Sequence, residues 1–187
     1  QKIEVFNFDA RLEWDTLTGP LDHKVMLGLD YSDNSTDWRG SYADAAPLDF
    51  ADPLYGRPFG PFTSYSDHDS TTERGLYLQD IATFGPWHAT LGGRWSDVDL
   101  KYRSNDDPSW NYDVSDQVFV GNAGLLYLTP SGIAPYVSFA QSYVPQTGTT
   151  WQGDPFEAQR GDQYELGVKY QPPGLDMLLT AALFQIT

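Results

Sequence analysis

Apolar and polar side chains alternate strictly over the stretch Gln163–Tyr170 of this chain. One parity holds two aromatic and two aliphatic residues, and the other holds charges of both signs and a glycine. Successive side chains of a β-strand point to opposite faces, so the stretch predicts a strand with one apolar and one polar face. Two settings fit this pattern: a soluble sheet with one wet face, or a membrane barrel with a wet lumen.

The same period of two recurs along the chain and predicts about eight strands, with no convincing helix. The expected strands are Phe6–Trp14, Lys24–Ser32, Glu73–Thr83, His88–Arg103, Gln117–Leu128, Ile133–Tyr143, Gln163–Tyr170 and a last one from about Met177 to the end. In the fourth, the apolar parity changes between Trp95 and Val98, which predicts a β-bulge near Ser96–Asp97.

Connections between these strands alternate in length. Short turns rich in Gly and Pro are expected at 18–23, 84–87, 129–132 and 171–176, and long polar loops at 33–72, 104–115 and 144–162. Tight turns at one end and long loops at the other are typical of an antiparallel up-and-down meander in an outer-membrane barrel. The predicted fold class is therefore all-β, with strands long enough to cross a bilayer when tilted.

Aromatic residues gather near the ends of the expected strands, as an interfacial girdle requires. The candidates for this girdle are Trp14, Tyr31, Trp87, Trp95, Tyr102, Tyr127, Tyr143 and Tyr170.

The amino-acid composition excludes several classes of function. The formal net charge of -15 argues against binding to nucleic acid, because contacts to phosphate need a basic surface. The chain has no Cys, so it has no disulfide framework and no thiol chemistry. No run approaches the roughly 20 apolar residues of a transmembrane helix, a test that membrane strands escape.

No catalytic constellation or metal site is expected. The three histidines lie far apart in the sequence, and no Gly-x-Ser-x-Gly motif occurs. Asp67, His68 and Asp69 are consecutive, and three neighbours on an extended chain do not converge easily on one ion.

Three ordered stretches carry a family resemblance. They are Gly75–Asp80 followed by Leu91–Trp95, then Ala134–Tyr143, then Gly161–Tyr170. In this order and spacing the chain resembles the middle of the barrel of TonB-dependent siderophore receptors, within them the ferrichrome or hydroxamate type. The resemblance extends from about Phe6 to Thr187.

The resemblance implies an all-β segment of a 22-stranded barrel in the outer membrane of a Gram-negative bacterium. Such a receptor binds ferric siderophore and imports it with energy delivered by TonB through a plug domain. Residues 1–187 would form a partial barrel domain, without plug, TonB box or signal peptide and with both ends cut, and this piece alone is not expected to transport. The resemblance implies no catalysis and no cofactor, because the siderophore carries the iron.

Two sets of site residues follow. Loop aromatics give large contact area to the organic shell of a siderophore at little entropic cost, and the candidates near the expected mouth are Trp38, Tyr42, Trp110, Tyr112 and Trp151. The polar strand faces would line the lumen and contact the plug, or be solvated as a wet wall, and their residues are Asn7, Asp9, Arg11, Glu13, Arg94, Glu165 and Lys169. The loop aromatics have an alternative role in packing the loops or joining the girdle.

Two other classes of protein fit the pattern. One is a soluble β module whose exposed aromatics bind carbohydrate or another ligand, and the other is a complete small eight-stranded outer-membrane barrel. For the barrel segment, the outer wall would contact lipid, and two open strand edges predict self-association of the isolated piece in water.

Overall fold

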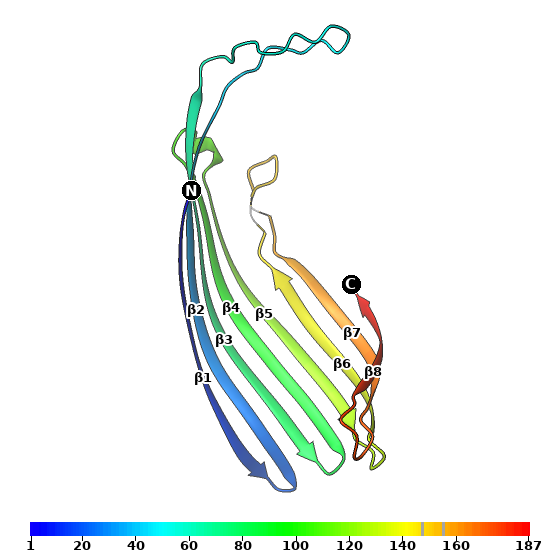
Figure 1. Cartoon of the computed structure of the whole chain (residues 1–187). Helices are drawn as coiled ribbons and strands as arrows, with labels where there is room; N and C mark the ends of the chain where they lie inside the picture. Colours follow the sequence, from blue (N-terminus) through cyan, green and yellow to red (C-terminus); the bar gives the residue numbers. More distant parts are fainter. Residues whose placement is uncertain (147, 155) are drawn as a thin grey trace.

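The computed structural model describes residues 1–146, 148–154 and 156–187. They form one antiparallel sheet in which eight strands lie side by side in chain order (Figure 1). The strands are β1 (Lys2–Thr18), β2 (Leu21–Tyr42), β3 (Thr63–Phe84), β4 (Trp87–Ser104), β5 (Tyr112–Tyr127), β6 (Ile133–Val144), β7 (Gln159–Tyr170) and β8 (Leu179–Ile186). This up-and-down meander confirms the predicted fold class.

All the short connections lie at one end of the sheet, which we call the turn end. Gly19 and Gly85 adopt positive φ, 61° and 56°, in the two-residue turns after β1 and β3. Such turns match the right-handed twist of the strands they join, and positive φ favours glycine. The long connections leave from the opposite end, the loop end, in the predicted short–long order (Figure 1).

Strands β2 and β3 are much longer than predicted. The expected loop 33–72 is mostly strand, because β2 continues to Tyr42 and β3 begins at Thr63, leaving only 43–62 between them. The pairing runs without a break from Asp22↔Thr83 to Tyr42↔Thr63. Backbone hydrogen bonds hold this extension, so it needs no apolar alternation, and the sequence pattern did not reveal it.

The predicted β-bulge at Ser96–Asp97 is wrong. Strand β4 pairs with β3 and with β5 in one unbroken register along its length. Val98, Leu100 and Tyr102 therefore lie on the same face as Arg94, and it is the chemistry of that face that changes from polar to apolar toward the loop end.

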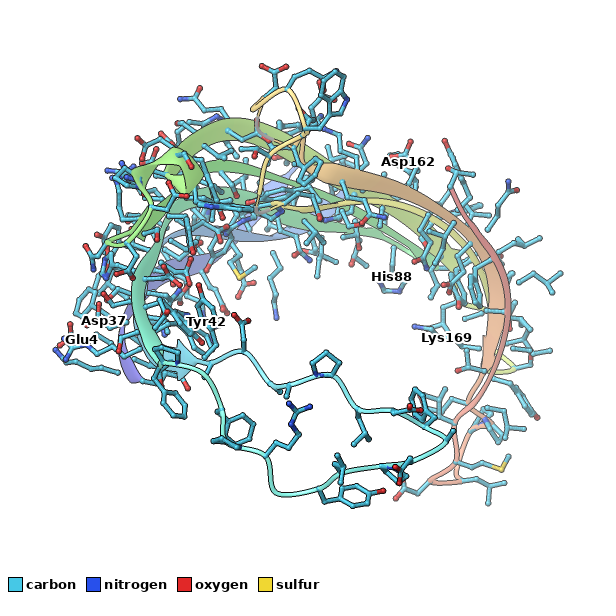
Figure 2. All side chains as sticks on the ribbon, turned by 90° about the horizontal axis from the view of Figure 1, so that it is seen from above. Glu4, Asp37, Tyr42, His88, Asp162 and Lys169 are labelled. Carbon is cyan, nitrogen blue, oxygen red and sulfur yellow. The ribbon has the colours of Figure 1, made fainter. Side chains whose placement is uncertain are left out.

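The sheet curves into a trough with two chemically different faces (Figure 2). Tyr42, His88 and Lys169 point into the concave side, whereas Glu4, Asp37 and Asp162 lie on the convex side (Figure 2). In the half of the sheet nearer the turn end, the side chains of the convex face are apolar and exposed, with Leu91 68% and Phe119 62% accessible. An exposed apolar face of this extent indicates contact with a membrane or with another apolar surface.

We call this exposed apolar zone of the convex face the belt. Aromatic side chains lie at both of its borders. Trp87 packs on Tyr127 at the turn end, with ring centroids 4.7 Å apart, and Trp95 follows eight residues further along β4, so that Trp87–Trp95 spans nine residues. A tilted strand of about 9–11 residues crosses a bilayer. Beyond the belt the convex face becomes charged, with Arg74 3.1 Å from Asp99. The belt is therefore as tall as the hydrocarbon core of a membrane, and the strands continue past it.

Two residues of the expected girdle belong to the concave side instead. Tyr102 faces inward because the register has no bulge. Tyr143 reaches the inner face of β3, where its hydroxyl donates to Glu73 Oε1 at 3.1 Å.

The best-buried residues lie on the inner face, near the loop end. Strands β5 and β6 pair only from Asn122↔Ala140 to Leu126↔Tyr136. Beyond that point the β6–β7 hairpin leaves the edge of β5 and lies over the inner face, where Val98, Leu100 and Val118 become buried. A small core therefore joins the hairpin to β4 and β5.

The sheet does not close on itself. Within the described residues β1 pairs only with β2 and β8 only with β7, so both outer strands present free edges. This excludes the alternative of a complete eight-stranded barrel for the arrangement seen here. In the described part of the chain, no helix is long and apolar enough to cross a membrane, and Pro108–Trp110 forms a single 3-10 turn.

Candidate functional site

The concave face near the turn end is a polar wall. Asp9 accepts a hydrogen bond from the Tyr77 hydroxyl at 3.1 Å, and Asn7 accepts one from Ser32 at 2.8 Å. Arg11 lies 3.3 Å from Glu13, and both side chains are more than half exposed. These four predicted lumen residues thus share one face and remain open to solvent or to another part of the protein.

Arg94 is the centre of the best-connected polar cluster on this wall. Its guanidinium donates to Asp30 Oδ1 at 2.9 Å and to Glu73 Oε1 at 2.8 Å. Its Nε donates to Ser96, which is fully buried. Tyr143 donates to the same Glu73, so the cluster joins β2, β3 and β4 to the β6–β7 hairpin. Arg94 therefore acts first as a structural tie, a role the sequence did not predict.

The last two predicted lumen residues, Glu165 and Lys169 of β7, both contact Tyr136. Tyr136 donates to Glu165 Oε1, and the ammonium of Lys169 lies over the Tyr136 ring, 5.2 Å from its centroid. The Tyr136 ring also covers Gly167, where an added Cβ would come within 2.5 Å of it. All seven predicted lumen residues thus lie on the concave side, while their contact with a plug domain stays a prediction.

Above the belt the concave face becomes aromatic. The rings of Tyr102 and Tyr112 stack with centroids 5.4 Å apart and an angle of 12° between their planes. Trp110 lies just before β5, and the three rings share a pocket of about 490 Å³ with Phe156. Together with Trp38 and Asp69 we call these residues the aromatic wall.

Trp110 is positioned by a capped turn. Asp107 caps Pro108–Trp110 by accepting from the Ser109 backbone at 3.0 Å and from its hydroxyl at 2.6 Å. These hydrogen bonds, chiefly that of the Ser109 hydroxyl, lower the pKa of Asp107 because they favour the ionised carboxylate. Despite this anchoring Trp110 is 69% exposed, so its ring is available to a ligand.

Trp38 extends the aromatic wall onto β2. Its indole N–H donates to Asp69 Oδ2 at 2.9 Å, and Asp69 also lines the pocket beside Tyr112. Burial raises the pKa of Tyr112, and the nearby Asp69 charge raises it further, because both disfavour the phenolate. In Tyr102 burial is again the first cause of a raised pKa, followed by the charge of Asp67.

The structure does not unite all five predicted aromatics. Trp110 and Tyr112 line one pocket, and Trp38 joins them through Asp69. Tyr42 points into the concave space from the end of β2 (Figure 2), outside the described lining of that pocket. Trp151 is 91% exposed and is likewise absent from that lining. Their roles in ligand binding stay predictions.

Two aromatic members of the aromatic wall, Tyr102 and Phe156, were not predicted from the sequence as binding residues. Tyr102 lies near a strand end and so fits the outer girdle by position, but the unbroken register of β4 places it on the concave face. Phe156 belongs to the loop after β6 and meets β4 and β5 only through the folding of the hairpin. The contact of Phe156 with β4 and β5 cannot be predicted from any periodicity in the sequence.

The segment 43–62 extends across the open side of the trough when the molecule is viewed from the loop end (Figure 2). One backbone hydrogen bond ties its two sides together, from Gly60 to Asp44 at 2.9 Å. Its aromatic side chains are strongly exposed, with Phe50 at 96% and Tyr55 at 81%. The segment thus offers further exposed aromatic surface beyond the loop end of the sheet (Figure 1).

Consecutive Asp67, His68 and Asp69 do not converge. His68 points to the convex face, where its Nδ1 lies 2.7 Å from Asp37, whereas Asp69 contacts Trp38 on the concave face. Strand alternation separates the imidazole from both neighbouring carboxylates. Across the described residues, no group of three or more His, Cys, Asp or Glu side chains is arranged to hold a metal ion.

A curved antiparallel sheet with an apolar convex belt and a polar concave wall defines part of a transmembrane β-barrel. Comparison with known proteins gives the family. Residues 2–187 match the family model described as TonB dependent receptor-like, beta-barrel, and the chain belongs to this family. TonB-dependent receptors are outer-membrane β-barrel proteins of Gram-negative bacteria.

Curated relatives include the ferrioxamine B receptor of Salmonella typhimurium strain SL1344, 34% identical over all of this chain and 26% of that protein. The ferrichrome outer membrane transporter/phage receptor of Escherichia coli K12 is 30% identical over the same shares. The chain thus spans about a quarter of the length of these relatives.

Solved structures give the same fold. The alcaligin outer-membrane receptor of Bordetella pertussis superposes with a TM-score of 0.75 at 24% identity, over 98% of this chain and 29% of that one. The ferric-catecholate import receptor of E. coli K12 gives a TM-score of 0.78 at 19% identity, over 98% and 31%.

Proposed function

We propose that this chain forms part of the barrel wall of an outer-membrane receptor that binds a ferric siderophore and imports it with TonB-derived energy. The aromatic wall is the observation that carries the proposal. Its rings lie on the concave side, past the belt, on the side where the long loops leave. A ligand arriving from outside the cell meets this surface before it reaches the polar wall near the turn end.

Iron enters this proposal as cargo inside the siderophore, so the protein contacts the organic shell and supplies no metal ligand of its own. Flat, rigid rings suit such a ligand because they bury large area and lose little side-chain entropy. The relatives are named as receptors and a transporter, which supports transport over catalysis.

The polar wall near the turn end has a second proposed role, contact with the plug domain of the complete receptor. Arg11 and Glu13 retain exposed charges there. The convex belt would face lipid. A soluble carbohydrate-binding module fits less well, because the belt would then expose its apolar side chains to water.

The test uses the full-length protein in a host that lacks its own siderophore receptors. Uptake of radioactive iron from ferric trihydroxamates is measured with and without an intact TonB system. We expect uptake that requires TonB and that falls when Tyr112 and Trp110 are both replaced by alanine. Uptake that continues unchanged without TonB would contradict the proposal.

Isolated in water, residues 1–187 would expose the belt and the free edges of β1 and β8. We propose that this piece associates with copies of itself through those edges. Light scattering coupled to size-exclusion chromatography distinguishes this from a monomer, and a monodisperse monomer in detergent-free buffer would contradict it.

A further inference from the structure

His23 and Asp80 form a polar pair on the convex face. The Nδ1 atom of His23 lies 2.7 Å from Asp80 Oδ2, so the contact joins β2 to β3. His23 shares its parity along β2 with Asp37, which lies on the convex side (Figure 2). The pair therefore faces the phase that surrounds the belt and not the lumen.

The register places this pair at the turn-end border of the belt. Val25 pairs with Trp14 on β1 and with Asp80 on β3, and His23 lies two residues nearer the turn. Trp14 and Trp87 are the aromatic side chains nearest the turns of β1 and β4. Because the strands are tilted, the line that joins these two rings crosses β2 and β3 close to the pair (Figure 1). The pair thus lies at the depth where lipid head groups meet the acyl chains.

Two hydrogen-bonding atoms of the pair are left over. Within the described residues, neither Nε2 of His23 nor Oδ1 of Asp80 has a hydrogen-bond partner, and both atoms are covered from solvent. Buried polar atoms are nearly always partnered, because an unmet hydrogen bond costs stability. The Asp80 side chain as a whole is 34% accessible, and the last torsion of an Asp side chain turns readily. A group that approaches from the membrane can therefore reach the carboxylate.

A second pair of the same kind shows that the surroundings make the difference. The Nδ1 atom of His68 lies 2.7 Å from Asp37 Oδ1, again between β2 and β3 on the convex face. These two side chains stand beyond the belt and are 44% and 43% accessible. Water can meet their remaining hydrogen bonds, whereas the His23–Asp80 pair needs a partner from the membrane itself.

Asp80 also stands at one end of an apolar groove in the belt. The groove has a volume of about 490 Å³ and runs across β3, β4 and β5 to Phe139 on β6. Its walls include Leu78 and Leu91. At Gly121 an added Cβ would meet no atom closer than 3.5 Å, so this part of the groove is open. An apolar groove that begins at a carboxylate suits a molecule with a polar head and a hydrocarbon chain.

We propose that the His23–Asp80 pair and this groove bind one phospholipid of the leaflet at the turn end, with a zwitterionic head group that bears a primary ammonium. The ammonium donates to the Asp80 carboxylate, and the phosphate accepts from Nε2 of the protonated His23 ring. One acyl chain lies in the groove. The inference goes beyond the proposed function and shares with it only the placement of the belt against lipid.

Charge complementarity selects this class of lipid. A hydrogen bond between an ammonium and a carboxylate is stronger than one between neutral groups. A quaternary ammonium offers no N–H to Asp80, and an anionic head group without an amine is repelled by the carboxylate. Phosphatidylethanolamine therefore fits the pair better than phosphatidylcholine or phosphatidylglycerol.

The experiment measures lipid binding to the full-length receptor in detergent by native mass spectrometry. Apparent dissociation constants are determined for phosphatidylethanolamine, phosphatidylcholine and phosphatidylglycerol with identical acyl chains. The unaltered receptor is compared with Asp80→Asn and His23→Gln, and the matched controls are Asp37→Asn and His68→Gln in the pair beyond the belt. Heat-modifiable migration on gels shows that each variant is folded.

We expect the unaltered receptor to bind phosphatidylethanolamine about fivefold more tightly than either other lipid. Asp80→Asn should remove this preference, and His23→Gln should weaken all three lipids, because each carries a phosphate. The two control variants should behave as the unaltered receptor does. Equal affinities of the unaltered receptor for the three lipids would overturn the inference, and so would a preference that survives in Asp80→Asn.

A further substitution tests the groove. Gly121→Leu fills the open part of the groove, and Ala89→Leu enlarges a belt residue outside its described lining. Gly121→Leu should weaken all three lipids about threefold and keep the preference for ethanolamine, while Ala89→Leu should change neither. Equal effects of the two would overturn the placement of the chain. A receptor that shows the lipid preference but fails the uptake test would lose the proposed function and keep this inference.

Discussion

Tyr102 and Tyr112 lie directly opposite each other in the β4–β5 register, and their rings stack at 5.4 Å with 12° between the planes. The pair closes the strand pairing at the loop end and forms the floor of the candidate ligand pocket. Aromatic pairs contribute about 0.5–1.5 kcal/mol beyond the area that they bury. The same two rings therefore stabilise the strand ends and shape the binding surface.

Replacing Tyr112 with alanine should weaken binding of a ferric trihydroxamate about tenfold, because the ligand loses one ring directly and the support of the other. Tyr112→Phe keeps the ring and should bind within about twofold of the unaltered receptor. Titration calorimetry on the full-length receptor measures both. Equal losses in the two variants would show that the hydroxyl, and not the ring, matters.

Arg94→Ala should destabilise the barrel by about 2 kcal/mol, because it leaves Asp30 and Glu73 facing each other without their shared cation. The control is Arg74→Ala on the convex face, whose ion pair with Asp99 is half-exposed. That variant should cost less than about 0.5 kcal/mol. Unfolding of the full-length protein in detergent, followed by its heat-modifiable migration on gels, gives both values. Equal costs would contradict a structural role for Arg94.

Gly28 and Tyr77 should be energetically coupled. The Tyr77 ring lies across Gly28 so closely that an added Cβ would come within 2.1 Å of it. Gly28→Ala should therefore displace the ring and break its hydrogen bond to Asp9, at a cost of about 1 kcal/mol. In a Tyr77→Ala background the same change should cost little or become stabilising, since nothing remains to displace. Additive effects in this double-mutant cycle would contradict the coupling.

Leu91→Lys should destabilise the barrel in lipid by about 2–4 kcal/mol, because it places a charge on the lipid face of the belt. Thr90→Lys, one residue away on the concave side, is the matched control and should cost less than about 1 kcal/mol. Folding efficiency into phospholipid vesicles compares the two. If the Thr90 variant were the worse one, the assignment of the two faces would be reversed.

The Asp107 cap should make the turn that carries Trp110 sensitive to acid. The folded-state pKa of Asp107 is lowered, so its contribution is complete above the ordinary value of 3.8 and is lost as the pH falls below it through the lowered folded-state pKa. Asp107→Asn keeps a capping oxygen and should abolish this pH dependence, whereas Asp107→Ala should weaken ligand binding about threefold even at neutral pH. Ligand affinity and Trp fluorescence between pH 7 and pH 3 test both. A binding curve for Asp107→Asn that still falls with acid would assign the effect to another group.

Much of the fold was readable from the sequence because membrane strands impose a period of two. Alternation at Phe6–Trp14 and Gln163–Tyr170 located strands and their faces, and the order of short and long connections gave the meander. The boundaries of β2 and β3 were not readable, because their extensions beyond the belt show no regular apolar alternation. Pairing of neighbouring backbones holds them there, and pairing leaves no pattern in a single strand.

Some residues of the candidate site could likewise be predicted from the sequence, and others could not. Trp110 and Tyr112 stood out as aromatics in a polar stretch, and the structure brings them together. The face of Tyr102 could not be predicted correctly from the sequence. The concave face of β4 changes from polar to apolar along the strand, and in the sequence this change resembles the switch of parity that a β-bulge produces. Phe156 and the Arg94 cluster depend on where the β6–β7 hairpin lies, which no local pattern encodes.

The sequence by itself thus determined the strand count, the order of connections, the two faces of the belt and the resemblance to TonB-dependent receptors. These properties are local or periodic, and each residue reports its own environment through its polarity. Only the tertiary structure decided which rings and carboxylates share a pocket, and that Tyr143 and Arg94 tie the hairpin to the wall. Those contacts join residues far apart in the chain, and they are fixed by curvature and register, not by the polarity of any one position.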